Sequence, residues 1–144
     1  MKICVVSSVG GHLREVLQLE PLWRPYEVFF ILNDETPVPL PYRSYRIAHA
    51  ERDLRVLWNL WECARILYRE RPAVILSTGA GPAVPAALIG KLLGARIIFI
   101  ESFACVRTPS LTGRLLYPLA DHFFYQWEAL RAHFPRGTYA GTIF

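Results

Sequence analysis

Two glycine-rich segments hold the residues whose types and order are best suited to chemistry. The first is Ser7-Ser8-Val9-Gly10-Gly11-His12 and the second is Ser77-Thr78-Gly79-Ala80-Gly81-Pro82, each between an apolar run and a helical pattern. Glycine lets the backbone approach an anion closely, and a helix start presents unpaired N–H groups to it. Either segment alone is equally consistent with a plain tight turn. Two of them at the ends of nearby strands predict an anion or diphosphate site, with His12 at its mouth.

A carboxylate follows another apolar run. Glu101 comes directly after Arg96–Ile100, and an acid at the carboxyl end of a strand could act as a general base or bind sugar hydroxyls. An ion pair with one of the many arginines is the other interpretation. Further along, Arg107 and Arg114 flank Thr108-Pro109-Ser110. These two arginines could clamp a phosphate as bidentate donors, or they could be ordinary solvated side chains.

Several well-known signatures are absent from the sequence. There is no G-x-G-x-x-G and no G-x-x-x-x-G-K-[ST], which argues against a dinucleotide cofactor and a P-loop. Neither G-x-S-x-G nor Asp-x-Asp occurs, so a nucleophile elbow and a sugar-nucleotide site built on a metal-binding acidic pair are not expected. The four histidines are scattered without zinc spacing. We therefore predict no metal and no bound cofactor.

The composition indicates a folded chain with a basic, arginine-rich surface. Its 144 residues are 53% hydrophobic and 19% charged, which excludes a disordered chain. The formal net charge is +4, and 14 of the 16 basic residues are arginine. Such a surface suits a phosphorylated ligand, an anionic membrane or nucleic acid. Three cysteines without metal or redox spacing indicate a reducing compartment.

Apolar runs alternate with helical patterns along the chain, so we predict one α/β domain over 1–144 with a doubly wound, mostly parallel sheet. Ligands of such sheets bind at the carboxyl ends of the strands. The uncharged stretch 72–90 could span a bilayer by its length, but its internal prolines and glycines would break a spanning helix. The expected strands are 3–7, 26–32, 42–47, 73–77, 96–100, 122–125 and 138–140, and the expected helices are 12–19, 51–69, 82–93, 111–119 and 128–133.

The helix expected over 51–69 has more apolar residues than contact with one side of a sheet requires. Its polar residues, Asn59 among them, form a narrow stripe, and apolar residues cover the rest. We interpret the surplus as a surface for a membrane or a partner, formed by Trp58 and Trp61 beside Arg65.

Taken together, these segments resemble the acceptor-side, membrane-recruiting subunit of split GT-B glycosyltransferases. In eukaryotes this subunit belongs to the UDP-N-acetylglucosamine transferase of dolichol-linked oligosaccharide synthesis, and bacterial counterparts serve capsule and exopolysaccharide assembly. The resemblance covers almost the whole chain. It rests on Ser8–Glu15, Ser77–Pro85, Ile98–Ser102, Arg107–Gly113 and Ala120-Asp121.

The chain is also similar to the N-terminal domain of the peptidoglycan enzyme that adds N-acetylglucosamine to a lipid-linked muropeptide. Gly10-Gly11-His12 and Gly79–Gly81 match two glycine-rich loops of that domain. At the strand end Ile100-Glu101-Ser102 only the glutamate matches, because this chain lacks the histidine and the asparagine found there. The first loop is also shorter here.

The resemblance implies a Rossmann-like domain equivalent to the N-terminal domain of a GT-B enzyme, and a division of labour. This chain would bind a polyprenyl-diphosphate-linked acceptor and, as a peripheral protein, the cytoplasmic inner face of the plasma membrane. A separate GT-B C-terminal-type subunit would bind the UDP-sugar donor, and nucleic acid would not be a partner. The pair would transfer the sugar with inversion in bacterial surface polysaccharide synthesis, and this chain would be inactive alone.

The resemblance also assigns roles to individual residues. His12 or Glu101 would be the catalytic base. The acceptor diphosphate would lie against Ser8, Gly10, Gly11, Thr78, Gly79, Gly81 and Arg107, and the membrane or the partner would contact Trp58, Trp61 and Arg65. Two other functions stay open at this point. The chain could be a non-catalytic anchor that recruits a catalytic partner, or a stand-alone nucleotide-binding α/β domain.

Overall fold

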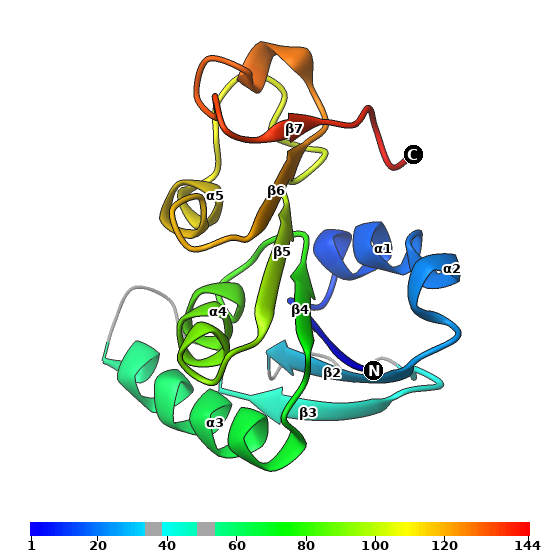
Figure 1. Cartoon of the computed structure of the whole chain (residues 1–144), viewed down its shortest axis with the longest axis vertical. Coiled ribbons are helices and arrows are strands. Elements are labelled where there is room, and N and C mark those ends of the chain that lie inside the picture. Colours follow the sequence, from blue (N-terminus) through cyan, green and yellow to red (C-terminus); the bar gives the residue numbers. More distant parts are fainter. Residues whose placement is uncertain (34–38, 49–53) are drawn as a thin grey trace.

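The structure is a computed structural model that describes residues 1–33, 39–48 and 54–144. Seven strands form one sheet in the order β3-β2-β1-β4-β5-β6-β7, and every neighbouring pair is parallel (Figure 1). The strands are β1 Lys2–Ser7, β2 Glu27–Asn33, β3 Arg43–Ile47, β4 Val74–Ser77, β5 Arg96–Ile100, β6 His122–Tyr125 and β7 Thr138–Tyr139. This architecture confirms the predicted doubly wound α/β fold.

Helices cover both faces of the sheet. On one side lie α3 Arg55–Glu70, α4 Ala83–Leu92 and α5 Leu111–Leu116, and on the other lie α1 Gly11–Leu17 and the short α2 Glu20–Trp23 (Figure 1). Alternate residues of a central strand therefore enter different cores: Cys4 and Val6 pack with the first group of helices, and Ile3 and Val5 with the second. Burial on both faces explains why β1 and β2 read as unbroken apolar runs.

Several element boundaries differ from those expected. Pro21 does not simply end the first helix, because it stands at the start of α2, where a residue without an N–H is tolerated. The helix expected over 128–133 is a single 3₁₀ turn, Glu128–Leu130. The expected start of the long helix, 51–53, lies outside the described residues. Among those that are described, no helix is both long and apolar enough to cross a bilayer.

The long helix α3 packs on the sheet in an orientation that buries part of its polar stripe. Asn59 is buried, together with Cys63, Ile66 and Leu67 on the side that packs on the sheet. Apolar residues instead recur every three or four positions on the outer side, which gives α3 a second apolar stripe. Its exposed members are Leu57 (64%), Trp58 (54%), Trp61 (51%) and Tyr68 (66%).

The last residue of α3 holds the helix to the edge of the sheet. Glu70 is buried, and its carboxylate accepts hydrogen bonds from Lys2 Nζ at 3.1 Å, Arg43 Nη2 at 2.7 Å and the Tyr45 hydroxyl. Burial by itself would raise the pKa of the Glu70 carboxyl. The hydrogen bonds from Tyr45 and Lys2 and the charge of Arg43 outweigh burial and hold that pKa below its ordinary value of 4.5.

We expect Glu70→Gln to lower the free energy of unfolding at pH 7 by about 1–3 kcal/mol, because it removes the charge that Lys2 and Arg43 surround. A lowered pKa in the folded state means that the carboxylate stabilises the fold above its unfolded pKa. That stabilisation is lost as the pH falls through the folded value. The deficit of the variant, measured by urea unfolding, should therefore shrink as the pH falls below 4.5.

Glu27→Gln is the matched control for this prediction. Glu27 lies 3.5 Å from Lys2 and 3.6 Å from Arg43, but its side chain is 62% exposed. An exposed ion pair contributes little, so the control should change the free energy of unfolding by less than about 0.5 kcal/mol. Equal effects of the two substitutions, or a Glu70→Gln deficit that grows in acid, would contradict the account of the cluster.

Candidate functional site

The two glycine-rich loops meet where the strand order reverses. From β1 the chain proceeds through β2 to β3 on one side, then returns to β4 on the other side of β1. The carboxyl ends of β1 and β4 therefore border the crevice in which open α/β sheets bind ligands. The loop after β1 ends at Gly10, α1 begins with Gly11 and His12, and the loop after β4 carries Thr78 and Gly79. The topology thus brings together residues that are far apart in the sequence.

Reciprocal hydrogen bonds join the start of α1 to the loop after β4. His12 Nδ1 lies 3.2 Å from the Thr78 carbonyl oxygen, and the Thr78 hydroxyl donates to the His12 carbonyl oxygen at 3.1 Å. Because a carbonyl oxygen only accepts, the contact assigns the proton to Nδ1. The neutral ring then has a lone pair on Nε2, with which no described residue forms a hydrogen bond. The imidazole is therefore oriented as a general base needs to be.

Gly79 is required for this position of the imidazole. A Cβ at residue 79 would lie 2.9 Å from Cε1 and 3.1 Å from Nδ1 of His12, and the φ of Gly79 is +126°. Gly10, with φ +114°, lets the first loop turn into α1. The side-chain oxygen of Asn33, at the end of β2, accepts from the Val9 N–H at 2.9 Å and holds the same loop. Sequence reasoning missed Asn33, whose only signal is a polar residue at a strand end.

His12 lines a pocket of about 380 Å³ at this edge of the sheet. The other lining residues come from the start of α1, the loop after β5 and the last residue of the chain: Gly11, Arg14, Glu15, Ser102, Phe103, Ala104 and Phe144. The aromatic ring of Phe144 packs on that of Phe103, with centroids 5.2 Å apart. A half-buried imidazole in such a recess can accept a proton from a hydroxyl group that enters it.

Glu15 also lines this pocket, and the sequence gave it no role of its own. It is buried, and its carboxylate accepts from the Phe103 N–H at 2.7 Å, the Ser102 hydroxyl at 3.3 Å and the Gln126 amide. Gln126 also accepts from the Ile143 N–H at 2.8 Å. These bonds connect α1, the loop after β5 and the end of β6. The available signal was the position of Glu15, three residues after His12 on the same side of a helix.

Glu101, the other candidate base, is wholly buried and does not line the pocket. Its carboxylate accepts from the Ser102 N–H at 2.9 Å, the Ser110 N–H at 3.1 Å and the Ser110 hydroxyl at 2.7 Å. A Cβ on Gly113 would lie 2.1 Å from Glu101 Oε2, so α5 packs directly on this carboxylate. Through these hydrogen bonds Glu101 holds the two ends of the 102–110 loop together. The sequence left open an ion pair between Glu101 and an arginine, and none forms among the residues that the structure describes.

The predicted diphosphate contacts divide into three groups. Gly10, Gly11 and Gly81 are exposed and Ser8 is half-buried, and of these Gly11 lines the pocket. Thr78 and Gly79 are buried, and they contact His12 instead of lying open to a ligand. Arg107 is exposed on the 102–110 loop and does not line the pocket. In the described residues, no group of three or more His, Cys, Asp or Glu is placed to hold a metal ion.

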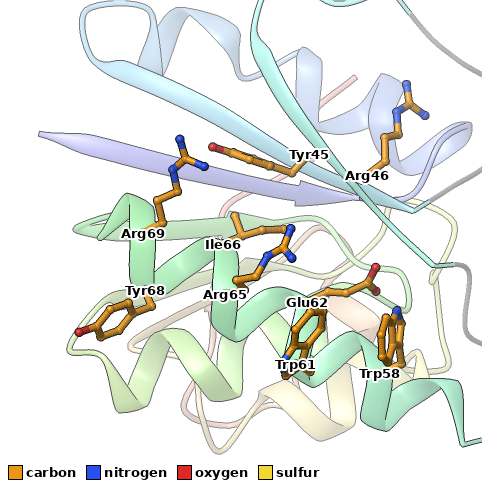
Figure 2. A pocket seen from close by; sticks show the side chains of 9 residues that line it. All are labelled: Tyr45, Arg46, Trp58, Trp61, Glu62, Arg65, Ile66, Tyr68 and Arg69. Atoms are coloured by element: carbon orange, nitrogen blue, oxygen red, sulfur yellow. The ribbon is translucent and has the colours of Figure 1, made fainter.

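The residues predicted to contact a membrane or a partner do lie together on the surface. Trp58, Trp61 and Arg65 project from the outer side of α3 (Figure 2). The two indole rings pack with centroids 4.9 Å apart, and the Arg65 guanidinium lies 5.2 Å from the centroid of the Trp61 ring. Flat aromatic rings beside a cation are typical of a surface that meets an interface between water and lipid or protein.

Several solved structures share this fold. The chain superimposes on 45% of a UDP-N-acetylglucosamine 2-epimerase from Rickettsia bellii with a TM-score of 0.79 and 10% identity. It superimposes on 42% of MurG from Acinetobacter baumannii with a TM-score of 0.72 and 14% identity. This chain thus spans less than half of each of those proteins. The likeness confirms the Rossmann-like domain of GT-B enzymes that the sequence predicted.

Sequence comparison is more specific. The chain is 32% identical to the rat UDP-N-acetylglucosamine transferase subunit ALG14, in an alignment that covers 98% of this chain and 82% of the rat protein. The model of the family described as "Oligosaccharide biosynthesis protein Alg14 like" matches residues 45–143. That range includes the outer stripe of α3, the second glycine-rich loop and the Glu101 loop. The chain therefore belongs to the family of Alg14-like oligosaccharide biosynthesis proteins.

Proposed function

We propose that this chain is one subunit of a two-subunit glycosyltransferase that uses a UDP-sugar, with UDP-N-acetylglucosamine as the first donor to test. This chain binds the lipid-linked acceptor and the membrane, and a separate GT-B C-terminal-type subunit binds the donor. The observation that carries the proposal is membership of the Alg14-like family, whose rat member is named a UDP-N-acetylglucosamine transferase subunit. The His12 pocket adds a place where an acceptor hydroxyl can be deprotonated.

The proposed chemistry is a single inverting displacement. The acceptor hydroxyl oxygen forms a bond to the anomeric carbon of the donor, and the bond from that carbon to the UDP oxygen breaks. His12 Nε2 takes the hydroxyl proton, since Nδ1 is held by Thr78. The acceptor diphosphate lies in the crevice against Gly10, Gly11 and Gly81, whose backbones are exposed. Glu101 supports the site through the 102–110 loop.

The outer side of α3 supplies the membrane contact in this proposal. Trp58 and Trp61 are each about half exposed, and Arg65 stands next to them. A helix with such a side can lie in the interfacial plane of a bilayer, which would bring the pocket to a polyprenyl-diphosphate substrate. The same side could instead cover a partner subunit, and vesicle binding distinguishes the two.

The decisive experiment is reconstitution. The chain and its candidate partner are purified separately and together, and transfer from UDP-N-acetylglucosamine to a polyprenyl-diphosphate-linked saccharide is measured. We expect activity only from the mixture. Activity of the partner alone in detergent solution would make this chain a non-catalytic anchor. Binding of the UDP-sugar by this chain alone, measured by calorimetry, would make it a stand-alone nucleotide-binding domain.

A finer part of the proposal concerns the pathway. We infer that the acceptor belongs to bacterial capsule or exopolysaccharide assembly, and that the chain works at the cytoplasmic, inner face of the plasma membrane. This inference rests on the sequence resemblance alone. Deletion of the gene should abolish the surface polysaccharide and leave the unextended lipid-linked acceptor in the cell. An unchanged polysaccharide would exclude this pathway while leaving the transferase chemistry open.

A further inference from the structure

The His12 pocket is aromatic on one side. Phe103, on the loop after β5, and Phe144 line it together with His12. The Phe103 ring meets the Phe144 ring edge to face, with centroids 5.2 Å apart and planes at 81°. It also packs on the indole of Trp127, with centroids 5.2 Å apart. The chemistry proposed for His12 uses none of these rings.

Phe103 is fixed in place by its backbone. Its N–H donates to Glu15 Oε1 at 2.7 Å, and its carbonyl oxygen accepts from Trp127 Nε1 at 2.7 Å. Because both backbone polar groups are used, the ring is the part of Phe103 that can contact a ligand. The residue is only half-buried where it lines the pocket. A ring that is already held in position loses little conformational entropy when a ligand packs on it.

The other side of the pocket is polar. His12 Nε2 forms no hydrogen bond with a described residue, and Arg14, on the same helix, is exposed. Glu15 and Ser102 also line the pocket, but they are hydrogen-bonded to each other and to neighbouring groups. A ligand that fills the pocket must therefore bring a hydroxyl group to His12 and an apolar surface to Phe103.

A pyranose ring has this combination of surfaces. Its hydroxyl groups project around the rim, and the C–H groups of one face form an apolar patch that packs on an aromatic ring. A prenyl chain would instead leave the polar side of the pocket without partners. The volume of about 380 Å³ is near the lower end of the range for ligand pockets, about 300–1,000 Å³, which suits one sugar unit.

We propose that Phe103 is the stacking platform for the terminal sugar of the acceptor. The sugar ring lies on the Phe103 ring and directs one hydroxyl group to His12 Nε2. This contact makes the site selective for a lipid that carries a saccharide over the bare polyprenyl diphosphate. The inference rests on the proposed function and adds a determinant of acceptor specificity to it. Phe103 binds and orients the sugar and takes no part in proton transfer.

The test measures dissociation constants of the full chain in detergent solution, without donor or partner. The two ligands are a short-chain polyprenyl diphosphate and the same lipid carrying one glucose, whose ring hydroxyl groups are equatorial. We expect the wild type to bind the glucose-bearing lipid about 10-fold more tightly. Phe103→Leu should weaken that binding by about 3- to 10-fold and leave binding of the bare diphosphate unchanged. Phe103→Tyr keeps the ring and should keep the preference.

Phe124→Leu is the matched control. Phe124, on β6, is also half-buried but does not line the pocket, so its replacement should leave the preference for glucose unchanged. A purely structural role of Phe103 predicts that Phe103→Leu weakens binding of both lipids equally.

That result would overturn the stacking platform, as would a preference that Phe103→Leu retains or equal binding of both lipids by the wild type. In each of these cases the chain still binds the lipid, and the acceptor role in the proposed function stands. If the wild type binds neither lipid, the acceptor role fails and the stacking platform fails with it.

Discussion

Replacing His12 by alanine is expected to lower sugar transfer by the reconstituted pair about 100- to 10,000-fold, the usual contribution of a general base. The reason is the orientation of the ring. The Thr78 carbonyl fixes the proton on Nδ1, so Nε2 is the group able to accept the proton of the attacking hydroxyl. Single-turnover assays with saturating acceptor would place the loss in the chemical step. The thermal midpoint should change little, because His12 is half-buried and at the start of a short helix.

A second pair of variants tests whether the position of the His12 imidazole matters for transfer, while the imidazole itself is kept. Gly79→Ala puts a Cβ 2.9 Å from His12 Cε1, so it should displace the ring and reduce transfer by about 100-fold. Gly94→Ala imposes comparable backbone strain, since φ is +88°, but has no atom within 4 Å of the new Cβ. It should lower the free energy of unfolding by about 1 kcal/mol and leave transfer intact.

Full activity of His12→Ala would contradict the first prediction. It would place the catalytic base on the partner subunit and favour the anchor function.

Replacing Glu101 by alanine is expected to destabilise the fold by about 3 kcal/mol or more, because it leaves three donors, one buried and two part-buried, without their acceptor. Those donors are the Ser102 N–H, the Ser110 N–H and the Ser110 hydroxyl. The Ser110 side chain also caps α5 by accepting from the Gly113 N–H at 2.8 Å. The loss should therefore spread from the 102–110 loop into α5, where hydrogen exchange of the amides would detect it.

Glu101→Gln distinguishes a structural from a catalytic carboxylate. The amide NH₂ must face one of the three donors, so the structural role predicts a stability loss of about 1–3 kcal/mol, shared in part by Ser110→Ala. A catalytic base predicts the reverse pattern, in which Glu101→Gln unfolds like the wild type but is inactive. Glu128→Ala is the control: its side chain is 68% exposed and it should change stability by less than about 0.5 kcal/mol.

Much of the fold follows from the sequence. The runs around Cys4, Phe29 and Ile75 are apolar on consecutive residues, which only strands buried on both faces require. The glycine pairs after two of those strands mark the loops that must turn sharply into helices. The boundaries near Pro21 and 128–133 were predicted less well, since a proline can begin a helix as well as end one.

Only the tertiary structure decided the hydrogen-bond partners and the burial of the polar residues. His12 and Thr78 are 66 positions apart, and Glu15 and Gln126 are 111 apart, so their hydrogen bonds depend on the strand order. The position of Glu101 at a strand end left open a base, a sugar ligand or an ion-pair partner, and only the tertiary structure shows that the loop folded over it supplies three donors and buries it. Asn59 and Trp58 are adjacent, but the packing of α3 on the sheet buries the asparagine and exposes the indole. A sequence pattern shows the period of a helix. Which of its sides faces the sheet depends on the free energy of all the contacts that the helix makes.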